Sequence, residues 1–171
     1  MNPLPSVDDL LPPMVQGINT LLADRPNRGA PALVGIHTGG VWVAQRLQSM
    51  LDLSGPLGRL DISFYRDDFT RVGMNPEVKP SYLPFRIDNR VLILVDDVLH
   101  TGRTIRAALN ELFDYGRPAR VILVALVERS GRELPIQADV TGLRLALDSG
   151  EHVKLTGPNP LSLVVQKAKV R

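Results

Sequence analysis

The sequence contains no cysteine among its 171 residues. Disulfide bonds and cysteine-based zinc sites are therefore excluded, and the absence agrees with a reducing compartment. Long apolar runs are missing too: the longest, Val121 to Val127, is far too short to cross a bilayer. The N-terminus, MNPLPSVDDLLPP, carries acids and prolines instead of a basic region followed by an apolar one, so it is not a secretory signal. These absences predict a soluble, cytoplasmic protein without a membrane segment.

Two common nucleotide-binding signatures are also missing. No Gly-Lys pair occurs, which excludes a P-loop of the form G-x-x-x-x-G-K-[ST]. Gly35, Gly39 and Gly40 do not have the G-x-G-x-x-G spacing of a dinucleotide-binding fold. The net charge is +2, too small to establish nucleic-acid binding. Most basic residues are arginines, which bind phosphate in a bidentate manner, so composition does not separate a protein that handles phosphorylated sugars from one that contacts RNA.

The most informative segment runs from Val91 to Thr104 and reads VLILVDDVLHTGRT. Its five consecutive apolar residues, Val91 to Val95, predict a strand buried on both faces of a parallel sheet. Asp96 and Asp97 follow at the predicted carboxyl end, which is where ligands bind in open α/β sheets. The turn Thr101 to Thr104 then leads into an amphipathic helix, whose first N–H groups suit a phosphate dianion. Carboxylates for sugar hydroxyls and a phosphate site therefore lie one short loop apart, as a ribose 5-phosphate requires.

The rest of the pattern predicts a single α/β domain over residues 1–171. Strands alternate with helices, which implies a parallel sheet with right-handed crossovers. The segment 66–89 has no sustained period, which is typical of a functional flap or a disordered loop, and short strands are expected within 138–165. The other predicted elements are a helix over Asp8 to Ala23, a strand over Ala32 to Ile36, a helix over Val41 to Leu51, a half-exposed strand over Gly58 to Tyr65 and a buried strand over Arg120 to Glu128.

The central segment resembles the phosphoribosyl pyrophosphate (PRPP) motif of type I phosphoribosyltransferases: an apolar strand, two acids, a few residues, then Thr-Gly and a second hydroxyl residue. Around it, LVGIHTGG, LDISFYRDD and VERSGRELPIQAD occur in the order seen in the PyrR family, the pyrimidine operon attenuation regulators that are also uracil phosphoribosyltransferases. The match runs from about Leu33 to Asp139. The resemblance implies a type I phosphoribosyltransferase fold, a mainly parallel sheet flanked by helices, with a flap over about 66–89 and a small C-terminal hood over about 138–165.

The same resemblance implies the reaction of uracil with PRPP to give UMP and pyrophosphate, assisted by Mg²⁺. Asp96 and Asp97 would be the catalytic pair that holds the ribose hydroxyls. Mg²⁺ would be held mostly by PRPP oxygens and waters, with these two carboxylates one water away and no direct protein ligand assigned. A homodimer or a higher homo-oligomer is expected from the resemblance alone. The other residues carried over are Thr101, Gly102, Arg103 and Thr104 for the 5-phosphate, Thr38 and Gly39 for pyrophosphate, Arg129 and Val153 for the base, and Arg66 and Arg86 in the flap.

Two departures from the family pattern shape what is expected. The pyrophosphate turn usually reads Thr-Arg-Gly, whereas here Gly39 stands in place of the arginine that would stabilise the leaving group. One lost contact of this kind costs on the order of 2–4 kcal/mol, roughly 30- to 1000-fold in rate, so weak turnover is expected, and arginine at position 39 is expected to raise it.

The second departure concerns the RNA-binding face of the family, which here has lost several of its basic residues. Arg132 remains as the candidate RNA contact. Where the family would have basic residues, this chain has the uncharged Val15, Gln16, Gln137 and Leu143.

Three hypotheses stay open at this stage. The preferred one is a PyrR-type uracil phosphoribosyltransferase with a role in regulating pyrimidine biosynthesis genes. The alternative is a nucleotide-sensing regulator that binds PRPP or UMP with negligible catalysis, with or without binding a pyrimidine-operon leader RNA. A purine phosphoribosyltransferase is the enzymatic runner-up. The sugar half of its site would look the same, and the choice of base depends on Arg129 and the C-terminal segment.

Overall fold

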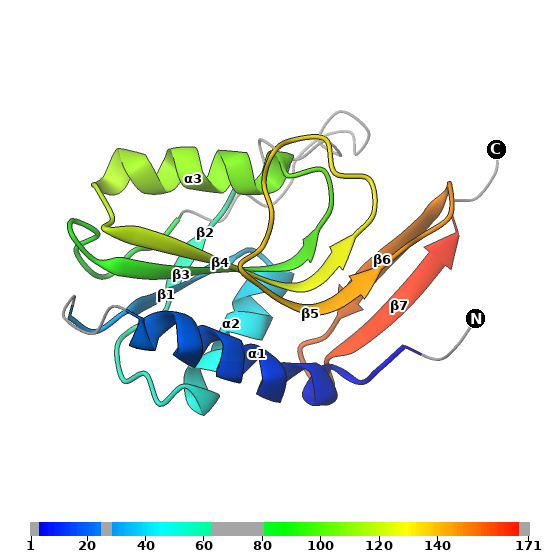
Figure 1. The fold of residues 1–171 in the computed structure, drawn as a ribbon, viewed down its shortest axis with the longest axis horizontal. Coiled ribbons are helices and arrows are strands. Elements are labelled where there is room, and N and C mark those ends of the chain that lie inside the picture. Colours follow the sequence, from blue (N-terminus) through cyan, green and yellow to red (C-terminus); the bar gives the residue numbers. More distant parts are fainter. Residues whose placement is uncertain (1–3, 25–28, 63–80, 168–171) are drawn as a thin grey trace.

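A five-stranded parallel sheet forms the centre of the protein (Figure 1). The computed structural model describes residues 4–24, 29–62 and 81–167. Neighbouring strands are parallel and lie in the order β2-β1-β3-β4-β5. The expected α/β class is therefore confirmed. The strands are β1 (Ala32–Ile36), β2 (Gly58–Leu60), β3 (Val91–Leu99), β4 (Arg120–Arg129) and β5 (Val140–Leu145).

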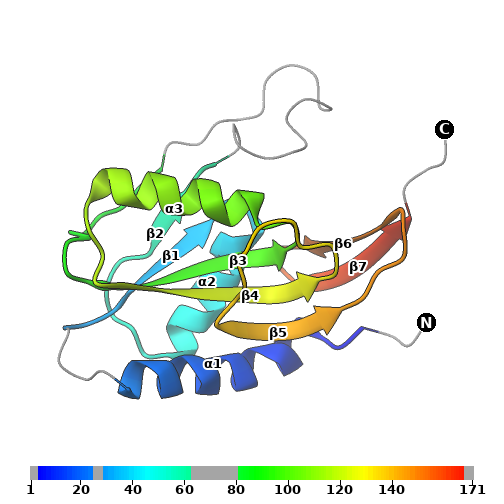
Figure 2. The same cartoon turned by 45° about the horizontal axis from the view of Figure 1, so that its top comes forward.

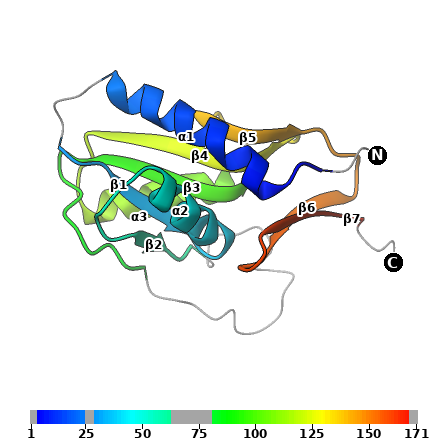
Figure 3. The ribbon, with the colours of Figure 1, turned by 90° about the horizontal axis from the view of Figure 1, so that it is seen from below.

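Helices cover both faces of this sheet. Helix α1 (Val7–Ala23) and helix α2 (Gly39–Met50) lie side by side on one face, and α3 (Arg103–Tyr115) lies on the other (Figures 1 and 3). Helix α1 starts at Ser6, whose side-chain oxygen accepts a hydrogen bond from the Asp9 N–H group at 3.2 Å, a common way to cap a helix. None of the described helices is long and apolar enough to cross a membrane.

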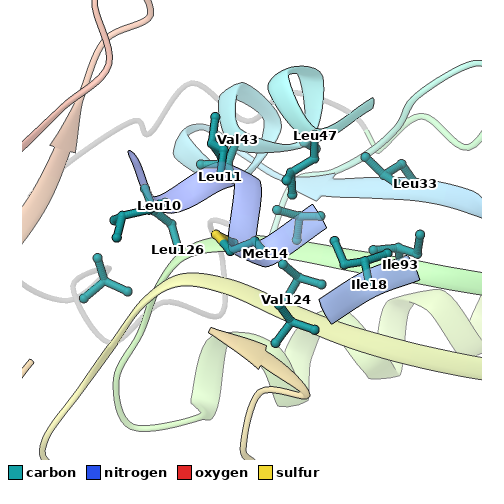
Figure 4. Packing of buried hydrophobic residues seen from close by; sticks show 14 of the residues in the cluster. Leu10, Leu11, Met14, Ile18, Leu33, Val43, Leu47, Ile93, Val124 and Leu126 are labelled. Atoms are coloured by element: carbon teal, nitrogen blue, oxygen red, sulfur yellow. The ribbon is translucent and has the colours of Figure 1, made fainter. Parts of the chain in front are cut away.

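The apolar half of strand β3 is buried on both faces. Ile93 and Val95 belong to the core beneath α1 and α2, whereas Leu92 and Leu94 belong to the core beneath α3. Figure 4 shows the first core, in which Ile93 packs together with Ile18 of α1. Burying one such side chain contributes about 1.5–3 kcal/mol. A parallel strand with helices on both faces is apolar at every position, which explains the unbroken run.

A second, antiparallel sheet of two strands follows the main one: β6 (Glu151–Thr156) and β7 (Ser162–Lys167). In Figure 2 the arrowheads of β3 and β4 point toward β6, and β6 contacts β3. Val153 and Leu155 of β6 are buried in the core beneath α1 and α2. This sheet is the expected hood, but it is shorter than expected. Strand β5, within the predicted hood range 138–165, pairs with β4 and so belongs to the main sheet.

Several element boundaries differ from the predictions. Strand β3 continues to Leu99, beyond the predicted end at Val95. It does so because β4 extends beside it, and the pairing of the two strands ends with Leu99 opposite Glu128. Strand β1 ends at Ile36 and pairs with β3 only up to Val95. Helix α2 begins at Gly39, two residues before the predicted start. Strand β2 ends at Leu60, and residues 63–80, which include the end of that predicted strand and most of the predicted flap, lie outside the described residues.

Candidate active site

A pocket of 740 Å³ opens where strands β1, β3 and β4 end, with the β6–β7 sheet as its far wall. Its walls come from the β1–α2 turn, the second half of β3 with the loop after it, the end of β4, and β6 with β7. The structure therefore brings together residues that are far apart in the chain. The predicted site residues that line the pocket are Thr38, Gly39, Asp96, Asp97, Thr101, Gly102, Thr104, Arg129 and Val153.

The two carboxylates lie within strand β3, which continues beyond them to Leu99, whereas they were expected at the carboxyl end of the strand. Asp96 is 1% exposed, and its Oδ1 accepts a hydrogen bond from the Asp97 N–H group at 3.0 Å. Its backbone still pairs with Ala125 of β4. On the other side β1 has already ended, so this edge of β3 is open to the pocket. The longer strand thus holds both acids on rigid backbone while leaving them room to meet a ligand.

The turn before α3 depends on a glycine. Gly102 is the residue that precedes the helix and has φ of 95°, a left-handed conformation that glycine adopts without strain. The Arg103 N–H group donates to Thr101 Oγ1 at 3.2 Å. A Cβ atom at Gly102 would lie 3.2 Å from Cβ of Leu134, so the turn is also tightly packed. Thr101, Gly102 and Thr104 line the pocket at the start of α3, and the start of a helix can bind an anion.

Arg103 is the predicted 5-phosphate residue that does not line the pocket. Its side chain turns to Glu133, with Nη2 2.8 Å and Nε 3.1 Å from Glu133 Oε2. The Thr101 carbonyl accepts hydrogen bonds from the N–H groups of Glu133 and Leu134, both at 3.0 Å. The RELPI sequence, which carried much of the resemblance, therefore has a structural use: it holds the phosphate turn in place.

A second helix begins at the same pocket. Helix α2 starts at Gly39, and Thr38 before it makes no side-chain capping hydrogen bond. The first N–H groups of a helix have no partner within the helix, and they carry the positive end of its dipole. The beginnings of α2 and α3 thus face one pocket, with Asp96 and Asp97 between them. Two helix starts and two carboxylates therefore line the same pocket.

The wall opposite the phosphate turn comes from the end of β4 and from the hood. Arg129 Nη1 lies 3.4 Å from His152 Nδ1, which links the two elements. His152, Lys154 and Gln166 line the pocket beside the predicted Val153, and the sequence analysis missed all three. His152 and Lys154 could have been found from the alternation in β6, where exposed polar residues are interleaved with buried apolar ones. Gln166 could not, because it reaches the wall only through the pairing of β7 with β6.

The remaining predicted residues lie elsewhere. Arg86 does not line the pocket; its side chain is 93% exposed and is 4.0 Å from Asp88. Arg66 falls outside the described residues. Arg132 is exposed, next to Glu133 in the segment that holds the phosphate turn. The described part of the chain contains no group of three or more metal-binding side chains.

A parallel sheet whose central strand carries two acids between two helix N-termini defines the class of phosphoribosyltransferases. The family model for the phosphoribosyl transferase domain matches residues 6–156. The bifunctional protein PyrR of Nitrosococcus oceani is 61% identical over 163 residues, covering 94% of this chain and 92% of that protein. The bifunctional protein PyrR of Pseudomonas paraeruginosa is 59% identical over 160 residues, covering 94% of each. The chain belongs to the PyrR family of phosphoribosyltransferases.

Solved structures support the same fold. A hypoxanthine phosphoribosyltransferase from Trypanosoma cruzi superimposes with a TM-score of 0.63 at 18% identity, covering 86% of this chain and 79% of that one. A hypoxanthine phosphoribosyltransferase from Staphylococcus aureus does so with a TM-score of 0.61 at 19% identity, covering 82% and 75%. At such identities the likeness establishes the fold alone. It confirms the expected phosphoribosyltransferase fold without bearing on the choice of base.

Proposed function

We propose that the protein is a uracil phosphoribosyltransferase, which joins uracil to the ribose 5-phosphate of PRPP and releases UMP and pyrophosphate. The observation that carries the proposal is the pair of helix N-termini on either side of Asp96 and Asp97 in one pocket. PRPP has a phosphate and a pyrophosphate on one ribose, so it needs two anion sites with acceptors for the ribose hydroxyls between them. Membership of the PyrR family favours uracil over a purine as the base.

Each wall of the pocket then has a role. The turn from Thr101 to Thr104 would bind the 5-phosphate through its hydroxyls and N–H groups, and Thr38 with Gly39 would bind the pyrophosphate. Asp96 and Asp97 would accept hydrogen bonds from the ribose hydroxyls. Holding the sugar and both anions on rigid elements supplies most of the catalysis, because the reaction needs positioning and charge stabilisation more than proton transfer.

Mg²⁺ is the proposed cofactor, and the residues present fit it. The ion usually keeps several waters and binds through one or two carboxylates together with substrate phosphates. The pocket provides two adjacent carboxylates, and the described residues include no larger metal-binding cluster. Asp96 and Asp97 would hold the ion through waters while the oxygens of PRPP bind it directly. When bound, it would neutralise charge on the leaving pyrophosphate.

The base would lie against the hood. Arg129 and Lys154 carry only hydrogen-bond donors and would face the carbonyl oxygens of uracil, and Val153 would pack against its ring.

The flap over 66–89 stays a prediction, as does its part in excluding water. A homodimer or higher homo-oligomer is proposed from the family resemblance, a single domain from the length of the chain, and a cytoplasmic location from its composition.

The direct test is formation of UMP from radiolabelled uracil and PRPP with Mg²⁺. We expect clear turnover by the wild type and a loss of at least about 100-fold in Asp97→Asn, which keeps the shape but removes the charge. Circular dichroism and thermal unfolding would check that the variant is folded. Equal turnover by the two proteins would contradict the assigned sugar site. Tight binding of UMP without turnover would favour the nucleotide-sensing alternative.

A regulatory role in pyrimidine gene expression is the second part of the proposal. The PyrR relatives are named bifunctional, and Arg132 is exposed directly beside the residues that hold the phosphate turn. Binding to a pyrimidine-operon leader RNA would be measured over a range of salt concentrations, because phosphate contacts weaken steeply with salt. Affinity no better than that for random RNA of equal length would reject specific recognition.

A further inference from the structure

We infer that Gly39 is a positioning residue for Asp97: its missing side chain leaves the space that the Asp97 side chain occupies at the start of α2. The inference rests on the proposed function, because Asp97 is proposed to hold the ribose of PRPP. It also changes the meaning of the Thr-Gly-Gly turn. The family pattern suggests a turn that has lost a useful arginine, whereas the structure assigns the glycine a use of its own.

The contact between the two residues is unusually close. A Cβ atom built at Gly39 would lie 2.5 Å from Cγ and 2.8 Å from Cβ of Asp97, and it would also overlap Oδ2. Turning the Asp97 carboxylate moves Cγ and the oxygens but leaves Cβ in place, because the backbone fixes Cβ. A side chain at position 39 would therefore have to displace Asp97 itself or the helix.

Neither backbone is free to move. Strand β3 stays paired with β4 on both sides of Asp97, at Asp96 with Ala125 and at Val98 with Val127. Helix α2 packs tightly on the sheet, since a Cβ atom at Gly40 would lie 2.5 Å from the Val95 carbonyl oxygen. On the face of α2 that packs on the sheet, Val43, Ala44 and Leu47 are fully buried. The collision would therefore be relieved mainly by a different orientation of Asp97.

The arrangement has an electrostatic benefit that an arginine would forfeit. A carboxylate beside the first turn of a helix interacts favourably with the positive end of the helix dipole. Gly39 thus lets Asp97 lie beside the start of α2, so that the carboxylate proposed to hold the ribose is next to the turn proposed for pyrophosphate. An arginine at position 39 would displace the carboxylate before its guanidinium could serve the pyrophosphate. We therefore expect Gly39→Arg to lower the rate, opposite to the expectation from the family pattern.

The decisive variant is Gly39→Ala. Gly39 is not among the glycines with positive φ, so alanine fits the backbone, and alanine is the better helix former. Helix propensity alone would thus predict a more stable protein with unchanged kinetics. We expect instead that kcat/KM for PRPP falls at least about tenfold, since misplacement by 1 Å is enough for a loss near 100-fold. The KM for uracil should change less than twofold. Gly55→Ala is the control, because nothing lies within 4 Å of a Cβ atom at that position.

A double-mutant cycle separates positioning from a general packing defect. Asp97→Gly removes every atom that collides with alanine at position 39. In that background Gly39→Ala should no longer lower the melting temperature or the affinity for PRPP with Mg²⁺ by calorimetry. An equal effect in both backgrounds would overturn the inference. The inference would also be overturned if Gly39→Ala had wild-type kinetics, or if Gly39→Arg formed UMP faster than the wild type.

The two proposals fail in different ways. If the wild type forms UMP and Gly39→Ala matches it, the positioning role is wrong and the proposed function stands. If the wild type binds PRPP without forming UMP, the proposed activity is wrong, and the effect of Gly39→Ala on PRPP affinity still tests the positioning role. If the wild type does not bind PRPP, both are overturned.

Discussion

At the scale of single residues, the site depends on places where a side chain is missing. Gly39 and Gly102 stand at the starts of α2 and α3, and each is crowded by a residue from another element. The reasons differ: Gly39 has an ordinary φ and makes room for Asp97, whereas Gly102 has φ of 95° and is crowded by Leu134. Substitutions at these two positions should therefore have different consequences.

Gly102→Ala is expected to damage both stability and phosphate binding. The left-handed backbone costs about 1–2 kcal/mol for alanine, and crowding against Leu134 adds about 1–3 kcal/mol. We predict that urea unfolding shows a loss of about 2–5 kcal/mol and that the KM for PRPP rises. Gly29→Ala is a matched control, because Gly29 has φ of 70° but nothing within 4 Å. If both variants lose the same stability, crowding of the phosphate turn is not significant.

At the scale of elements, periodic patterns in the sequence were enough to place most helices and strands. The strand at Ala32–Ile36 was predicted to the residue, because its burial depends on local composition. The end of β3 was not predicted correctly, because it depends on how far β4 extends beside it. Strand β5 was assigned to the hood for a similar reason: its residues alternate weakly, and only pairing with β4 places them in the main sheet.

In the site, too, features set by local sequence could be predicted, and features set by distant contacts could not. The acids and the phosphate turn lie within one contiguous segment with a recognisable pattern, so sequence alone could identify them. The contacts that orient them come from distant parts of the chain: Gly39 against Asp97, and Glu133 beside the turn at Thr101. Such contacts leave no local signal. The loss of an arginine at position 39 was visible in the sequence, but the space that the glycine provides was not.

The link between the phosphate turn and the RELPI segment gives a prediction at this scale. The Arg103–Glu133 ion pair is about half exposed, so its contribution to global stability should be small, about 0.2–1 kcal/mol. Its larger effect should be on the turn itself. We predict that Glu133→Gln raises the KM for PRPP severalfold while the melting temperature stays within about 2–4 °C of the wild type. If the ion pair holds the turn, Glu133→Gln should have no further effect on the KM in an Arg103→Gln background; additive effects of the two substitutions would mean that the ion pair does not hold the turn.

At the scale of the whole molecule, the pocket joins parts of the chain that are far apart in the sequence. It is lined by the β1–α2 turn, by β3 with the turn after it, by the end of β4 and by the hood. A ligand that contacts all four would oppose unfolding of the whole domain. The stabilisation follows from mass action: at a ligand concentration 100 times Kd it is about 2.7 kcal/mol.

This linkage predicts how melting depends on ligand and metal. For a domain of this size, 1 kcal/mol shifts Tm by about 2–4 °C, so PRPP with Mg²⁺ at 100 times Kd should raise Tm by about 5–11 °C. Removing the metal with EDTA should abolish most of the shift by PRPP, because Asp96 and Asp97 would hold the ion that neutralises the charge of PRPP. The shift by UMP should survive EDTA, since UMP lacks the pyrophosphate and depends on the phosphate turn. Differential scanning fluorimetry would measure all four conditions, with Gly55→Ala giving the same shifts as the wild type. If EDTA leaves the PRPP shift intact, Mg²⁺ is not part of the bound complex, and the pyrophosphate must be held by the start of α2 alone.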